Sequence, residues 1–87
     1  MRELLITPQF RKDAKVLPKY VLEICDLVLV KLRKNPLDRT LNIKRLKGFN
    51  PFVWRVRIGV YRLAYSFDDN FVVCLRFKHR KGVYRNL

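Results

Sequence analysis

The spacing of apolar residues near the start of the chain predicts a short strand and then a helix. Residues 3–6 suit a strand, and the Thr7-Pro8 pair that follows is typical of a helix start, with Thr7 as the N-cap and Pro8 in the first helical position. The helix is expected over residues 8–17, because Pro18 would interrupt it. Pro18 can itself begin a second helix.

The second helix is predicted from apolar residues that recur every three or four positions, as one buried face requires. This face comprises Val21, Ile24, Cys25, Val28 and Leu32. Basic residues at its end suit the helix dipole, and Asn35-Pro36 stops it. The two helices are therefore expected to form a hairpin hinged at Pro18.

Beyond residue 51 the apolar period changes to two, which predicts strands. The expected strands cover residues 52–59, 61–67 and 71–78. Gly59-Val60 fits a two-residue hairpin turn with Gly first, and Asp68-Asp69-Asn70 fits a three-residue turn. Residues 37–51 are expected to form a loop.

The predicted fold class is α+β, in a single domain over residues 1–87 with the order β-α-α-β-β-β. A mainly antiparallel sheet would carry the helical hairpin on one face. Hydrophobic residues make up 49% of the chain, which is enough for one core and argues against disorder.

The register of the first hairpin separates the apolar residues from the arginines. With Gly59-Val60 at the turn, Ile58 lies opposite Tyr61 and Arg57 opposite Arg62, and alternation gives each strand two different faces. The apolar face comprises Trp54, Val56, Ile58, Tyr61, Leu63, Tyr65 and Phe67, and the other face carries Arg55, Arg57 and Arg62.

A three-residue turn before the last strand extends this pattern. It would place Val73 and Leu75 on the core face and Arg76 and Lys78 on the arginine face. A two-residue turn would reverse the strand and bury Arg76, so it is disfavoured.

The distribution of charge along the chain indicates what the arginine face binds. The chain carries 20 Lys and Arg against 7 Asp and Glu, and from Arg39 to Leu87 there are 12 basic residues with only Asp68 and Asp69 as acids. Such asymmetry predicts a polyanionic partner, usually RNA or DNA, and an acidic protein is a second option. Arginines opposite one another destabilise a sheet, so phosphate binding is favoured over the alternative of a solvated face.

Two residues near the C-terminus, His79 and Tyr84, are candidates for roles in catalysis or base binding. His79, the single histidine, lies between Lys78 and Arg80, which argues against a buried role, and a neutral imidazole can accept a proton near pH 7. Tyr84 could stack on a base, or it could simply pack on the sheet edge.

Other function classes have little support in the sequence. Cys25 and Cys74 stand alone in apolar stretches, which predicts two buried free thiols in a reducing cytosol and no zinc site. We expect no signal peptide, and an apolar run such as residues 27–30 is far too short to cross a membrane.

Several motifs together resemble a known family. Leu46-Lys47-Gly48, the run from Trp54 to Gly59, the run from Tyr61 to Tyr65 and the run from His79 to Arg85 are similar to the RelE/ParE superfamily of toxins, with RelE the closer side. The resemblance implies a cytoplasmic endoribonuclease that cleaves mRNA in the ribosomal A site without a metal or cofactor. It also implies a cognate RelB-like antitoxin of acidic or mixed charge.

The resemblance also implies roles for individual residues. Arg62 would hold the scissile phosphate, Arg80 matches the basic residue after the last strand, and Tyr84 would orient the substrate base. The residues expected to bind RNA are Lys47, Arg55, Arg57, Arg76 and Lys78.

One departure from the family pattern changes the expected chemistry. Arg55 and Arg57 stand where the best-described RelE pattern has lysines, and an arginine does not deprotonate in proteins. Proton transfer is therefore assigned to His79. Two alternatives stay open: a ParE-like toxin that inhibits DNA gyrase, and a non-catalytic module that binds RNA or the ribosome.

Overall fold

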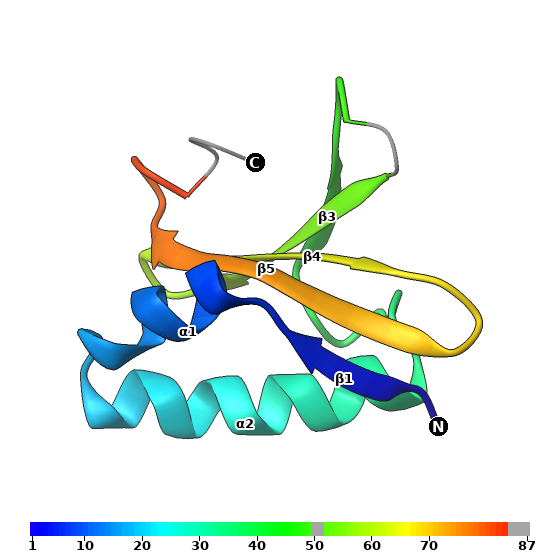
Figure 1. Cartoon of the computed structure of the whole chain (residues 1–87), viewed down its shortest axis with the longest axis horizontal. Helices are drawn as coiled ribbons and strands as arrows, with labels where there is room; N and C mark the ends of the chain where they lie inside the picture. The colour runs from blue at the N-terminus through cyan, green and yellow to red at the C-terminus, as the bar shows by residue number, and fades with distance from the viewer. Residues whose placement is uncertain (50–51, 84–87) are drawn as a thin grey trace.

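The computed structural model describes residues 1–49 and 52–83, and it shows a mixed sheet with two helices packed against one face (Figure 1). The elements are β1 (Glu3–Ile6), α1 (Pro8–Lys15), α2 (Lys19–Lys34), β2 (Ile43–Leu46), β3 (Val53–Ile58), β4 (Tyr61–Phe67) and β5 (Phe71–His79). The five strands are ordered β1-β5-β4-β3-β2, and only β1 and β5 run parallel. The predicted α+β class, with both helices on one face, is confirmed.

Strand β2 corrects the predicted element order. Residues 37–51 were expected to form a loop, yet Ile43–Leu46 pairs antiparallel with β3, with Ile43 opposite Val56 and Leu46 opposite Val53. Only the two ends of this four-residue strand are apolar, so a period of two is too short to recognise. The order is thus β-α-α-β-β-β-β.

The start of α1 follows the prediction and also joins the helix to the sheet. The Thr7 hydroxyl accepts a hydrogen bond from the Phe10 N–H at 3.2 Å, and Pro8 begins the helix. The same hydroxyl donates to the Cys74 carbonyl at 2.8 Å. The cap therefore fixes the first turn of α1 against β5.

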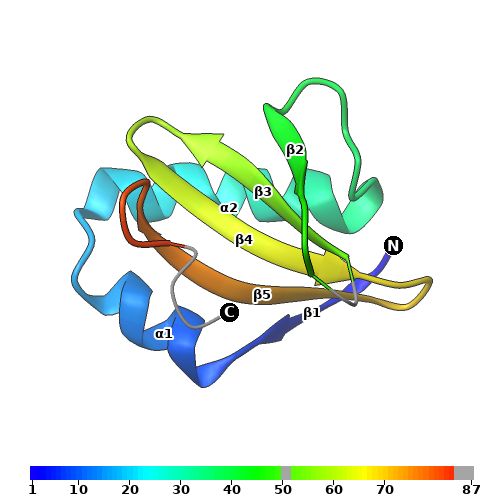
Figure 2. The ribbon, with the colours of Figure 1, turned by 90° about the horizontal axis from the view of Figure 1, so that it is seen from above.

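Helix α2 buries a face slightly rotated from the predicted one. Val21, Cys25, Val28 and Leu32 are buried as expected, whereas Ile24 is 43% exposed and Leu29 is buried in its place. Leu29 lies one turn after Cys25, so the centre of the buried face runs through these two positions. Viewed from above, α2 crosses beneath β3 and β4, and α1 lies beside β5 (Figure 2).

The hairpin of β3 and β4 has the predicted register. Ile58 lies opposite Tyr61 and Arg57 opposite Arg62, and Gly59 adopts the positive φ of 60° that the turn requires. The apolar face is confirmed as well: Val56, Ile58, Leu63 and Tyr65 are buried, and Trp54, Tyr61 and Phe67 pack against them.

The turn between β4 and β5 differs from the prediction. The Asp68 N–H donates to the Phe71 carbonyl at 3.0 Å, which closes a two-residue turn and places Phe67 opposite Val72. Val72 is consequently buried in the core. The prediction that Val73 and Leu75 join the core face is wrong.

A β-bulge then restores the predicted faces at the end of β5. Cys74 pairs with Tyr65 and Arg76 with Ala64, so Leu75 is an extra residue on β5. After the bulge, Phe77 lies opposite Leu63 in the core, and Lys78 lies opposite Arg62. The two-residue turn therefore does not bury Arg76 by register.

A second, smaller apolar cluster lies on the opposite face of the sheet. Its buried residues are Val53, Ala64 and Val83, and Leu46, Phe49 and Leu75 pack against them. Val83 is 0% exposed, so the chain after β5 turns back onto this face.

Both cysteines are free and buried, as predicted. Burial raises the pKa of each thiol to about 12. Over residues 1–49 and 52–83, no helix is long and apolar enough to cross a membrane.

Candidate phosphate-binding groove

A basic groove lies between the β2–β3 hairpin and the chain after β5. It has a volume of about 560 Å³ and is lined by Lys44, Arg45, Leu46, Lys47, Arg55, Arg57, Arg62 and Arg80. Seven of the eight lining residues are cationic and none is acidic. A groove of this composition attracts a polyanion and concentrates positive potential along its length.

Arg62 is the most firmly held of these cations. It is only 6% exposed, and its Nη1 donates to the carbonyls of Gly59 at 2.8 Å and of Tyr61 at 2.9 Å. Both acceptors belong to the β3–β4 hairpin. The turn therefore fixes the guanidinium on the groove wall.

The strand β3 supplies two further arginines. Arg55 Nη1 donates to the Asn42 carbonyl at 3.2 Å, and the Arg57 N–H donates to the same oxygen at 3.2 Å. The Arg57 side chain is exposed and lies directly opposite Arg62. Like charges directly opposite one another on neighbouring strands destabilise a sheet, and an anion bound between Arg57 and Arg62 would remove this repulsion.

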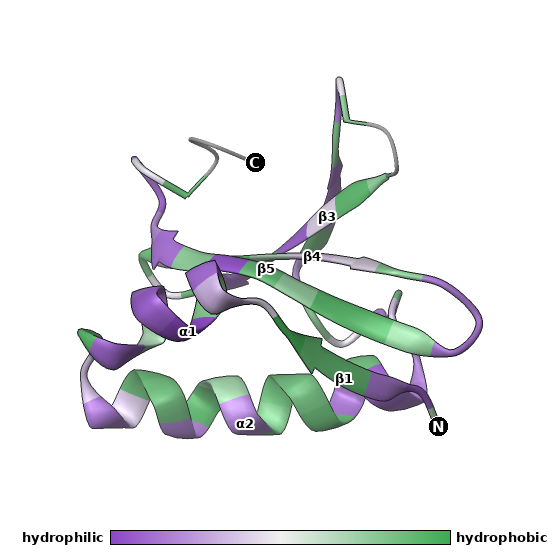
Figure 3. Cartoon of the chain, in the orientation of Figure 1, coloured by the Kyte–Doolittle hydropathy of each residue, from purple (hydrophilic) through white to green (hydrophobic). Residues whose placement is uncertain are grey.

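Arg80 lines the groove because a backbone hydrogen bond holds it against the turn between β3 and β4. The Arg80 N–H donates to the Val60 carbonyl at 2.9 Å, directly after the end of β5. The hydrophilic residues at this end of β5 are visible in Figure 3. The groove thus brings together Lys47, Arg55, Arg57, Arg62 and Arg80, five of the predicted site residues. Lys44 and Arg45 were missed because their strand was expected to be a loop.

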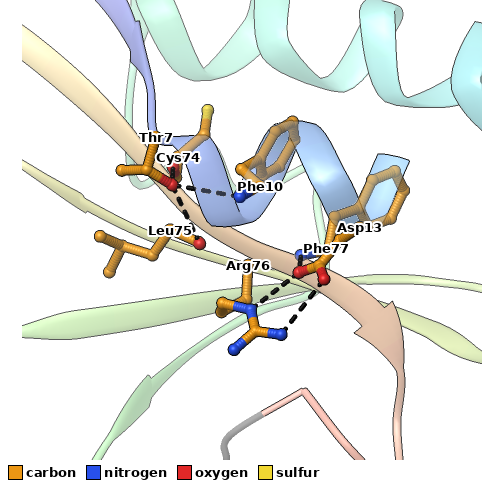
Figure 4. Close-up of polar contacts among 7 residues, drawn as sticks. All are labelled: Thr7, Phe10, Asp13, Cys74, Leu75, Arg76 and Phe77. Carbon is orange, nitrogen blue, oxygen red and sulfur yellow. Dashed lines mark hydrogen bonds and ion pairs between the residues drawn. The ribbon is translucent and has the colours of Figure 1, made fainter. Parts of the chain in front are cut away.

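Arg76, which was predicted to bind RNA, is not among the residues that line the groove. Its Nε donates to Asp13 Oδ2 at 2.8 Å and its Nη2 to Asp13 Oδ1 at 3.1 Å (Figure 4). The side chain of Arg76 is 12% exposed and that of Asp13 is 7% exposed. The hydrogen bonds to Asp13 raise the pKa of Arg76 further, so its guanidinium stays charged.

The role of Asp13 was missed from the sequence. Besides Arg76, its Oδ2 accepts the N–H of Phe77 at 3.0 Å, so one carboxylate joins α1 to the end of β5. The available signal was its isolation: Asp13 is the one acidic residue between Glu3 and Glu23.

Lys78 and His79 also lie outside the groove. His79 is paired with Tyr61 across the sheet, and the two rings meet edge to face with centroids 6.3 Å apart. His79 Nδ1 accepts the Lys81 N–H at 3.3 Å. Because Lys78 lies opposite Arg62, alternation turns His79 to the other face. The same alternation was readable in the sequence. Tyr84 lies outside the described residues.

Comparison with known proteins identifies the class of protein that has this fold and this groove. A family model described as the ParE toxin of the type II toxin–antitoxin system parDE matches residues 4–84. The chain belongs to this family.

Individual relatives place it among the RelE-like toxins. It is 37% identical over 78 residues to a protein named RelE1 from Methanocaldococcus jannaschii, covering 86% of each chain. It is 30% identical over 84 residues to the toxin RelE3 of the same organism, covering 94% of each chain. A crystal structure of a RelB–RelE antitoxin–toxin complex from Methanococcus jannaschii matches with a TM-score of 0.76 and 27% identity, over 88% of this chain and 91% of that one. The protein is a RelE-like toxin of a type II toxin–antitoxin system.

The Asp13 carboxylate generates a prediction for stability. Asp13→Asn keeps the shape of the side chain but removes its charge and sets an amide against the donors of Arg76. Breaking one partner of a buried, hydrogen-bonded ion pair costs about 2–4 kcal/mol of unfolding free energy. Urea denaturation measures this loss.

The matched control is Asp26→Asn, which removes an exposed carboxylate from α2. It is expected to change the unfolding free energy by less than about 0.5 kcal/mol. Equal losses of unfolding free energy for the two substitutions would contradict this, because they would show that Asp13 stabilises the fold no more than an exposed carboxylate does.

Proposed function

We propose that this toxin is an endoribonuclease that cleaves mRNA at the ribosome, in the A site, and so inhibits translation. The observation that carries the proposal is the groove, in which seven cations and no acid surround a space suited to a nucleic-acid backbone. The reaction is attack of a ribose 2′-oxygen on the adjacent phosphorus, with departure of the 5′-oxygen. The products are a 2′,3′-cyclic phosphate and a 5′-hydroxyl.

The groove supports this chemistry through charge stabilisation. The pentacoordinate transition state carries more negative charge on its equatorial oxygens than the phosphodiester does. Donors that are already oriented stabilise such charge without reorganising, and a guanidinium matches the spacing of two phosphate oxygens. Arg62 is oriented in advance by two backbone carbonyls, and Arg80 approaches from the end of β5.

The proton from the 2′-hydroxyl needs an acceptor, and the groove arginines cannot supply one. Proton transfer by His79 stays a prediction from the sequence. Its imidazole is exposed at the end of β5, one residue before Arg80, but it faces Tyr61. Transfer to the groove would require the ring to turn around the strand end. The predicted role of Tyr84 in orienting the base is part of the same proposal.

We also propose a cognate antitoxin as the partner in the resting state. The related RelE of Methanococcus jannaschii was crystallised as a RelB–RelE complex. The charge of +13 and the acid-free groove favour a RelB-like antitoxin whose acidic or mixed-charge segment covers the groove.

The first test is cleavage of mRNA by purified toxin, with and without ribosomes. Arg80→Ala is expected to lower the cleavage rate about 100-fold, because it removes one charge-stabilising donor. Arg39→Ala removes an exposed arginine that does not line the groove, and it should stay within about twofold of wild type.

The main competing function is ParE-like inhibition of DNA gyrase, and the matching family model bears the ParE name. A supercoiling assay separates the two. Gyrase inhibition by a toxin that leaves mRNA intact would overturn the ribonuclease proposal.

A second test addresses His79. If its imidazole accepts the proton, His79→Ala lowers kcat at saturating RNA by about 100-fold to 10,000-fold. Single-turnover cleavage at saturating RNA measures kcat, and a titration with uncleavable RNA measures binding. A variant that keeps kcat but binds RNA more weakly would contradict proton transfer by His79.

A further inference from the structure

A second cavity flanks the end of β5 on the side of α1. Its volume is about 390 Å³, and its walls include Lys12, Val16, Leu17, Tyr61, Lys78 and His79. The carboxylate of Asp13 also borders it, but that group is already bound to Arg76 and Phe77. The net charge offered to a ligand is therefore positive.

The side chains of this cavity combine two properties. Tyr61 and His79 present aromatic rings at 81° to one another, and Val16 and Leu17 add apolar surface. Lys12 adds an exposed ammonium group from α1. Aromatic rings that can stack on a base, together with cations that can neutralise a phosphate, are what single-stranded nucleic acids bind.

The cavity and the groove are joined through consecutive residues. His79 lines the cavity, and Arg80, the next residue, lines the groove. Lys78, which also lines the cavity, is paired with Arg62 of the groove. A strand of RNA that leaves the groove at Arg80 therefore meets the cavity around the end of β5.

We propose that this cavity is a subsite for one nucleotide of single-stranded RNA that flanks the cleaved phosphate. The inference rests on the proposed function, since it requires RNA in the groove. The cavity is near the lower limit of ordinary ligand pockets, which suits a single nucleotide and not a duplex. It gives His79 a part in binding that does not depend on proton transfer.

The experiment compares two lysines on the same helix. Lys12 lines the cavity, whereas Lys15, also exposed and in the last turn of α1, lines neither the cavity nor the groove. Each is changed to glutamate, and affinity is measured for a trinucleotide and a hexanucleotide of RNA. Both RNAs carry 2′-O-methyl riboses, which lack the attacking hydroxyl and cannot be cleaved.

Lys12→Glu is expected to weaken binding of the hexanucleotide about tenfold and to lower the magnitude of its salt slope by about one phosphate contact. Binding of the trinucleotide, which occupies only the groove, should change by less than about twofold at about 0.15 M salt, where exposed charges are screened beyond about 8 Å. Lys15→Glu should change neither affinity by more than about twofold.

Any of the following results would overturn the subsite. Equal losses with Lys12→Glu and Lys15→Glu, or equal losses for both RNA lengths, would show an effect of general charge. Unchanged RNA binding with weakened antitoxin binding would assign the cavity to an acidic side chain of the antitoxin. A wild-type toxin that cleaves mRNA although Lys12→Glu binds the hexanucleotide normally would refute the subsite alone, whereas a wild type that neither binds nor cleaves RNA would refute the proposed function as well.

Discussion

The end of β5 depends on the carboxylate of Asp13. Strand β1 pairs with β5 only from Phe71 to Cys74, so the edge of β5 beyond the bulge is covered by α1 instead. Asp13 accepts the Phe77 N–H and both donors of Arg76 there. An edge strand needs such cover, and here the cover also orients the segment that carries Lys78, His79 and Arg80. The groove and the cavity beside it both take residues from that segment.

The clustered positive charge of the groove favours binding of an anion but opposes folding. Seven cations in one depression repel one another, and Arg57 directly opposite Arg62 is a pairing that stability alone disfavours. Backbone carbonyls of Gly59, Tyr61 and Asn42 offset part of that cost by accepting from the guanidinium groups. Binding of a polyanion would remove the rest, which couples the stability of the toxin to its RNA or to an acidic antitoxin.

The parts of the fold that local patterns specify were predictable. Gly59 has the positive φ of a hairpin turn, and strict alternation on both sides of it fixed the register of β3 and β4 and the positions of Arg55, Arg57 and Arg62. The turn at Asp68–Asn70 was ambiguous because its residues suit loops of either length. The bulge at Leu75 was hidden, since leucine packs equally well on either apolar cluster.

Long-range contacts account for the rest. The bond from Asp13 to Arg76 joins residues 63 positions apart, and the isolation of Asp13 as an acidic residue does not indicate which cation it binds. The separation of His79 from the groove is different, because the predicted register already placed Lys78 on the arginine face and alternation then turns His79 away from it. Strand β2 becomes recognisable as a strand through its pairing with β3, which also brings Lys44 and Arg45 to the groove.

The most direct test of the central claim is an NMR titration of the toxin with an uncleavable 2′-O-methyl RNA. The side-chain Nε–H signals of Arg55, Arg57, Arg62 and Arg80 report on the groove one residue at a time. If the groove binds the RNA backbone, these signals shift together at low RNA concentration and return as salt is raised. Shifts confined to the exposed surface of α2, with the groove arginines unchanged, would contradict it.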